Sequence, residues 1–208
     1  MIASFPSTLQ PPEPLRLYFR WLEAEDAIDI SPVDGAIFSK VSPDQPDYSM
    51  LIKPVDPRFA STWLASGPDQ TGRLAAFVRS GGDGSHAAMW RNEGGGLSFV
   101  HLGSGSGSTL LCRLTDDPVD FLRLLAIGYE ELCWPEAFDQ TPEEAEQELT
   151  ELRGGKHNRP LKMRHWVETT FNVIVPDRAS EIISNIALMD DEYSDDPFWQ
   201  WMRKIQGY

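Results

Sequence analysis

The sequence predicts an α+β fold: a twisted antiparallel sheet of about four or more strands, covered by helices and followed by a helical C-terminal extension. Two observations support this prediction. Four short segments typical of strands follow one another between residues 74 and 114, joined by glycine-rich links. A segment with helical periodicity comes directly after them, and the character of the chain changes again after Trp134-Pro135.

The four central segments predict neighbouring antiparallel strands. They are Leu74–Arg79, His86–Arg91, Leu97–Leu102 and Thr109–Leu114. The links between them are five or six residues long, whereas parallel neighbours need crossovers of about a dozen residues or more. We therefore expect a meander. In the last strand Leu110, Cys112 and Leu114 share one face, which another element has to cover.

A helix over residues 118–133 is the nearest cover for that face. It opens at Asp117-Pro118, and its apolar positions follow the helical period: Phe121, Leu122, Leu125, Tyr129 and Leu132. The sheet and this helix together form the predicted core.

The N-terminal part of the chain predicts one further helix. Residues 1–14 are rich in proline and are expected to form an arm. Pro14 suits the first turn of a helix, whose apolar stripe consists of Leu15, Tyr18, Phe19 and Leu22. Prolines between residues 30 and 60 then permit only short extended pieces, at 36–41 and 50–53, before a helical turn at 59–64.

The C-terminal part predicts a series of helices. A capping box at Thr141-Pro142-Glu143-Glu144 opens the first, which carries Ala145, Leu149 and Leu152 and ends at Gly154-Gly155. Residues 160–170 favour a helix and then a loop, although 169–175 also has the pattern of a strand. Asp177 is expected to cap a helix with Ile182, Ile183, Ile186 and Met189, and Asp196-Pro197 opens a terminal helix. We therefore expect one domain over residues 15–208, with its core at about 60–134 and a helical part at 135–208.

Composition excludes several classes of protein. The net charge of −14 argues against nucleic-acid binding, which needs a basic surface, and favours a basic partner. Cys112 and Cys133 are too few for a disulfide scaffold, match no zinc spacing and are expected to be buried thiols. No apolar run approaches the ~20 residues of a membrane span, and the first residues lack the pattern of a signal peptide. A cytoplasmic protein is expected.

No motif predicts catalysis, a cofactor or a metal site. The loop 103–108 leads into a strand and not a helix, so it is a hairpin connection and not a phosphate cradle. The four histidines, His86, His101, His157 and His165, lack metal-ligand spacing and are expected to be structural or exposed. A basic island around residues 153–165 is expected to neutralise nearby carboxylates. The chain is not expected to be an enzyme.

Two acidic clusters are the candidate binding surface. The candidate partner-binding residues are Glu143, Glu144, Glu148, Asp190, Asp191, Glu192, Asp195 and Trp199. A solvated acidic face is the default interpretation, and a docking surface for a basic protein is the competing one. Trp199 lies about 200° from Trp201 around the terminal helix, so it falls off the apolar stripe and is a candidate for exposure at an interface.

The core resembles the SUKH superfamily, which contains bacterial toxin-immunity proteins and related fungal regulators of cell-wall synthesis. The resemblance rests on the segments 99–104, 110–114 and 118–129, and more loosely on the tail Phe198-Trp199-Gln200-Trp201-Met202. The N-terminal signature common in that superfamily is not evident between residues 15 and 60. The resemblance implies a binding fold without catalytic residues, which binds and neutralises a cognate, basic bacterial toxin.

Two other functions stay open at this point. The first is a housekeeping or regulatory protein-interaction module that is not linked to a toxin. The second is a hydrolase, which would need a pocket with converging titratable groups. A protein partner is expected for a toxin-immunity protein and for an interaction module, with no role for nucleic acid or a membrane. The partner, the binding face and the oligomeric state are not specified by the sequence.

Overall fold

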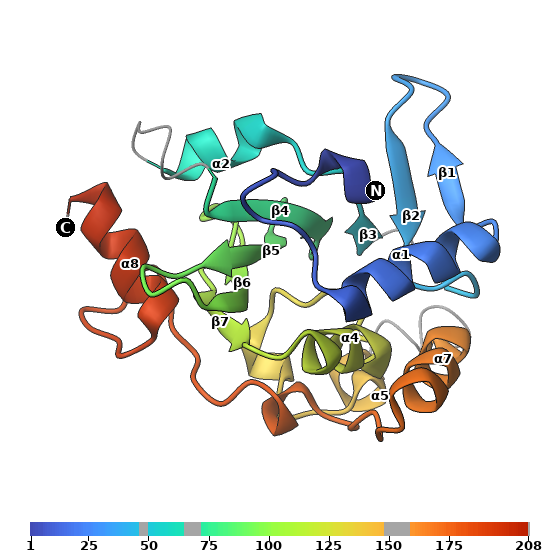
Figure 1. Cartoon of the computed structure of the whole chain (residues 1–208). Coiled ribbons are helices and arrows are strands. Elements are labelled where there is room, and N and C mark those ends of the chain that lie inside the picture. Colours follow the sequence, from blue (N-terminus) through green and yellow to red (C-terminus); the bar gives the residue numbers. More distant parts are fainter. Residues whose placement is uncertain (46–49, 65–71, 148–158, 208) are drawn as a thin grey trace.

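A computed structural model describes residues 1–45, 50–64, 72–147 and 159–207, and within them an α+β fold (Figure 1). Its sheet has seven strands in the order of the sequence, and every neighbouring pair is antiparallel. The strands are β1 (Ile28–Ile30), β2 (Ile37–Lys40), β3 (Leu51–Ile52), β4 (Leu74–Arg79), β5 (His86–Arg91), β6 (Leu97–Leu102) and β7 (Leu111–Thr115). The predicted meander is confirmed and extended by three strands on the N-terminal side.

The predicted strand boundaries agree with the structure at β4, β5 and β6. β7 begins two residues later than predicted, because Leu110 forms an isolated bridge with Leu188 instead. β2 and β3 lie inside the predicted extended pieces. β1 was not predicted, since three residues are too few to establish an alternating pattern.

The helices are α1 (Glu13–Ala24), α2 (Pro57–Trp63), α4 (Pro118–Ile127), α5 (Pro142–Ala145), α7 (Leu161–Phe171) and α8 (Pro197–Gln206). Four of them begin at a side chain that accepts backbone N–H groups: Asp56, Asp117, Thr141 and Asp196. The predicted helix-then-loop after residue 160 and the predicted terminal helix are confirmed. Leu149, Leu152 and Gly154-Gly155 of the first predicted C-terminal helix lie outside the described residues.

Helix α4 is shorter than predicted. It ends at Ile127, and Gly128 follows in the left-handed conformation with φ of +102°. Tyr129 and Leu132, which were expected on the helix, are buried in the irregular segment after it. The Tyr129 hydroxyl donates a hydrogen bond to the Gln140 carbonyl oxygen at 2.6 Å and accepts one from Ala179 N at 3.0 Å, which fixes this segment against the C-terminal part.

The prediction of a helix after Asp177 is wrong. Only a single 3₁₀ turn forms, at Ala179–Glu181. The following residues run along the edge of the sheet, where Leu111 N donates to the Ala187 carbonyl and Met189 N to the Thr109 carbonyl, each at 2.8 Å. The segment therefore pairs with the edge of the sheet through its backbone instead of forming the predicted helix.

Helices cover both faces of the sheet. In Figure 1, α1, α4 and α7 lie on one side and α2 lies on the other. Phe99 of β6 stacks on Phe121 of α4 with 4.3 Å between ring centroids. On the opposite face Trp90 of β5 packs against Phe198 and Trp201 of α8, at 5.3 and 5.4 Å. Trp90 and Phe99 point to opposite faces of the sheet, and both are buried, so both faces are covered at this point.

The N-terminal segment 1–14, expected as an arm, packs against the core. Phe5 and Leu9 are buried, and the Phe5 ring lies 5.5 Å from that of Phe77. Cys112 and Cys133 are free and buried, as predicted. In the part of the chain that the structure describes, no helix is long and apolar enough to cross a membrane.

Candidate functional site

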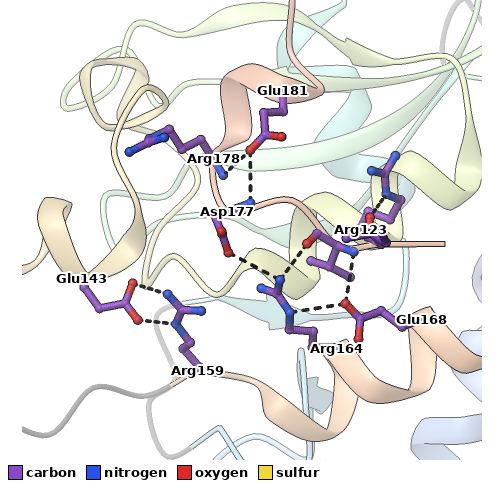
Figure 2. Close-up of polar contacts among 10 residues, drawn as sticks. Arg123, Glu143, Arg159, Arg164, Glu168, Asp177, Arg178 and Glu181 are labelled. Atoms are coloured by element: carbon purple, nitrogen blue, oxygen red, sulfur yellow. Dashed lines mark hydrogen bonds and ion pairs between the residues drawn. The ribbon is translucent and has the colours of Figure 1, made fainter.

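The first predicted acidic cluster is engaged with arginines of the same chain. Glu143 forms a two-pronged ion pair with Arg159, which Figure 2 shows. Glu144 closes the capping box by accepting from Thr141 N at 2.8 Å, and it lies 3.5 Å from the Arg178 guanidinium. These two carboxylates are therefore poor candidates for a docking surface. Glu148 lies outside the described residues.

The predicted basic island is neutralised in the same way. Arg164 reaches three partners in Figure 2: Glu168 at 3.5 Å, Asp177 at 3.4 Å and the Val175 carbonyl oxygen at 2.7 Å. Lys162 pairs with Glu25 at 3.0 Å. For Arg159, Lys162 and Arg164, the predicted neutralisation of nearby carboxylates is confirmed. Arg153, Lys156 and His157 fall outside the described ranges.

The second predicted cluster is an exposed loop before α8. Asp190, Glu192 and Asp195 are exposed, and Tyr193 between them has 74% of its surface accessible. Asp191 accepts a hydrogen bond from Leu188 N at 2.7 Å, and Asp195 accepts one from the Asn185 amide at 2.9 Å. Across residues 1–45, 50–64, 72–147 and 159–207, none of these four carboxylates forms an ion pair.

Trp199 is not exposed. Only 5% of it is accessible, and its indole N–H donates a hydrogen bond to the Leu188 carbonyl oxygen at 2.7 Å. The Arg203 guanidinium lies 5.2 Å from its ring centroid. The segment that runs beside β7 covers the side of α8 that was expected to face solvent. The candidate exposed anchor is thus part of the packed interior.

A third acidic site, which was not predicted, is a cavity of about 450 Å³ beyond the end of α4. The segment after α4 and the end of α5 form its walls. Its lining residues are Tyr129, Glu130, Glu131, Trp134, Glu136, Ala137, Gln140, Ala145 and Glu146. We refer to it as the acidic pocket. Among the described residues that line it, four are glutamates and none is basic.

Hydrogen bonds hold two of these glutamates in place. One oxygen of Glu131 accepts from Gly82 N and the other from the Trp134 indole N–H, both at 2.6 Å. Glu146 accepts from Glu130 N at 2.8 Å. The donors to Glu131 are neutral, so they orient its carboxylate without cancelling its charge. Burial, followed by the charges of Glu131 and Asp83, raises the pKa of the neighbouring Cys133 thiol well above its ordinary value.

The acidic pocket has the features that bind a cationic group. Fixed carboxylates attract a guanidinium or ammonium group, and the Trp134 ring provides an aromatic wall for it. The signal in the sequence was the close spacing of Glu130, Glu131, Trp134 and Glu136. It was missed because the first two were assigned to a helix that ends before them.

One serine–histidine pair in the described residues has the contacts of a nucleophile and its base. Ser80 Oγ lies 2.8 Å from His101 Nε2, and His101 Nδ1 lies 3.1 Å from the Leu110 carbonyl oxygen. Because a carbonyl only accepts, Nδ1 carries the proton and Nε2 accepts from the serine. Both side chains are fully buried, and burial lowers the pKa of His101 to about 4. The pair satisfies polar groups inside the fold and has no surface for a substrate, as expected for a structural histidine.

No group of three or more metal-ligating side chains occurs among the described residues. No protein-family model, curated protein or solved structure matches the chain.

Proposed function

We propose that this chain is a non-enzymatic protein-binding domain that binds and neutralises a basic bacterial toxin domain, as SUKH immunity proteins do. The acidic pocket is the observation that carries the proposal, because the carboxylates of Glu131 and Glu136 lie there beside Trp134. A pocket of this kind suits the side chain of an arginine or lysine that projects from a partner. Neutralisation then results from covering the active site of the toxin.

The distribution of charge supports a basic partner. The net charge of −14 produces a long-range field that accelerates encounter with a positive surface and disfavours acidic proteins. The loop of Asp190, Glu192 and Asp195 adds exposed carboxylates, and no Lys or Arg of the described residues pairs with them. Glu143 and Glu144 are left out of the proposed surface because Arg159 and Arg178 pair with them.

Binding is favoured over hydrolysis by the position of the serine–histidine pair. A catalytic base must reach a substrate within hydrogen-bond distance. Ser80 and His101 are each 0% exposed, and neither lines any of five cavities found among the described residues.

Gene context and co-purification test the proposal together. The tagged chain would be mixed with each toxin domain encoded beside its gene, and cells producing that toxin would be scored for survival with and without the chain. We expect stable binding and protection for one neighbour. Binding without protection would support the regulatory interaction module instead, and the absence of binding and protection for every neighbour would remove the proposal.

A further inference from the structure

A second cavity, of about 550 Å³, lies between α2 and the beginning of β5 on the sheet face opposite α4. Its apolar lining consists of Pro54, Phe59, Ala76 and Phe77, and its polar lining consists of Lys53, Asp56, Arg58, Thr62 and His86. Because Asp56 pairs with Arg58, Lys53 is the lining cation that has no ion-pair partner among the described residues. None of the residues of the acidic pocket takes part in it.

The ring of His86 is fixed with one nitrogen unused. It lies 4.2 Å from the Phe59 ring, and its Nδ1 is 2.8 Å from the Gly84 carbonyl oxygen. The carbonyl can only accept, so Nδ1 carries a proton. Nε2 has no hydrogen-bond partner among the described residues. In the neutral ring Nε2 is an acceptor, and it becomes a donor to an anion when the ring takes up a second proton.

The ammonium group of Lys53 also lacks a hydrogen-bond partner among the described residues. The residue is half-buried just after β3, and its side chain forms no hydrogen bond or ion pair within the described part of the chain. Arg58, by contrast, is 89% exposed at its side chain and pairs with Asp56 at 2.8 Å. Lysines that lose water on folding are usually paired with a carboxylate or with other acceptors. Lys53 has lost water without gaining a partner.

Two positive charges and one negative charge act on His86, and one charge of each sign acts on Lys53. Burial lowers the pKa of Lys53, and Arg79 lowers it further, while the exposed Asp34 acts in the opposite direction. Burial also lowers the pKa of His86. The charges of Lys53 and Arg79 lower it further, whereas the hydrogen bond to Gly84 and the charge of Asp83 raise it. An anion between them would relieve this repulsion.

We propose that this cavity binds a small organic anion, with a carboxylate or phosphate group held by Lys53 Nζ and by the Nε2–H of His86, whose ring takes up a proton from solvent on binding, and an apolar body against Phe59 and Ala76. The acidic group of the ligand would supply the negatively charged partner that Lys53 and His86 lack among the described residues. This site is separate from the proposed toxin surface, so the two can succeed or fail independently.

Isothermal titration calorimetry with benzoate, phenyl phosphate and neutral benzamide tests the site directly. We expect the anions to bind at least about tenfold more tightly than benzamide, since the ammonium and the protonated imidazole recognise negative charge. The stronger of the two anions identifies the preferred acidic group. Equal binding of benzamide, or no binding of either anion, would overturn the proposal.

Lys53→Gln and Lys162→Gln form a matched pair for the same titration. We expect Lys53→Gln to weaken binding of the anion by about tenfold or more, and Lys162→Gln, which removes an exposed lysine paired with Glu25, to leave it unchanged. Circular dichroism checks that both variants fold. Equal affinity of both variants and the original chain would contradict the assigned role of Lys53.

A histidine readout separates direct contact from a structural effect. In NMR spectra the pKa of His86 should rise when benzoate or phenyl phosphate is bound, because the anion offsets the charges of Lys53 and Arg79. An unchanged pKa at saturating anion would exclude contact with His86.

Discussion

A single carboxylate organises two of the glycine-rich loops. Asp83 accepts hydrogen bonds from Ser85 N, Ser85 Oγ, Ser104 Oγ and Ser108 N, all between 2.8 and 2.9 Å. Burial opposes ionisation, but these hydrogen bonds outweigh it and lower the pKa of Asp83 to about 2. The loop 103–108 is a connection between β6 and β7, as the sequence predicted, and a residue about 20 positions earlier holds it in place.

Replacing Asp83 by asparagine should destabilise the fold. An amide oxygen and an NH₂ group cannot serve four donors, so we expect the free energy of unfolding to fall by about 1–3 kcal/mol. Asp190→Asn is the matched control, because that carboxylate is exposed and makes no polar contact within the described ranges. Urea denaturation at neutral pH measures both. Similar losses in the two variants would show that Asp83 does not hold the loops.

Burial of neutral His101 predicts that stability depends on pH. Its pKa is lowered from 6.5 to about 4, so the unfolded chain takes up a proton at a higher pH than the folded one. The free energy of unfolding is therefore fully present above pH 6.5 and falls as the pH drops toward 4. The slope should approach about 1.4 kcal/mol per pH unit.

His86 contributes with the same sign, so the measurement is best made in a His86→Gln variant. Urea denaturation between about pH 5 and 6.5 stays above the ordinary pKa values of carboxylates. A stability that does not change over that interval would contradict the neutral, buried state of His101.

At the scale of elements, local patterns predicted the central strands and several helix starts. Alternation and short links were sufficient for β4, β5 and β6, and Asp or Thr followed by Pro marked the starts of α4, α5 and α8. Helix ends and irregular segments depended on distant residues. Gly128 meets Pro160, and the residues after Asp177 pair with β7, neither of which a local pattern reveals.

The end of α4 can be tested with two glycine substitutions. A Cβ at Gly128 would lie 2.5 Å from Pro160 Cδ and would also be strained by the φ of +102°. A Cβ at Gly95, where φ is +86°, meets no atom within 4 Å. We expect Gly95→Ala to cost about 1 kcal/mol and Gly128→Ala about 1–3 kcal/mol more. Equal thermal stability of the two variants would contradict the close packing of α4 on the segment before α7.

For the molecule as a whole, composition predicted an acidic surface but not which carboxylates remain available. The ion pairs of Glu143 with Arg159 and of Glu144 with Arg178 join residues far apart in the sequence. The acidic pocket forms only because α4 ends early and the chain turns back at Trp134. The sequence therefore predicted that the candidate site is acidic, but it did not predict where the site lies.

The affinity of the cognate basic toxin domain for two charge-reversal variants tests the proposed pocket most directly. Glu136→Lys changes an exposed residue of the acidic pocket, and Glu23→Lys makes the same change in net charge on an exposed position of α1. We expect Glu136→Lys to weaken binding by at least about tenfold and Glu23→Lys by about twofold or less, since contact outweighs the long-range field. Equal effects of the two variants would contradict binding at the acidic pocket.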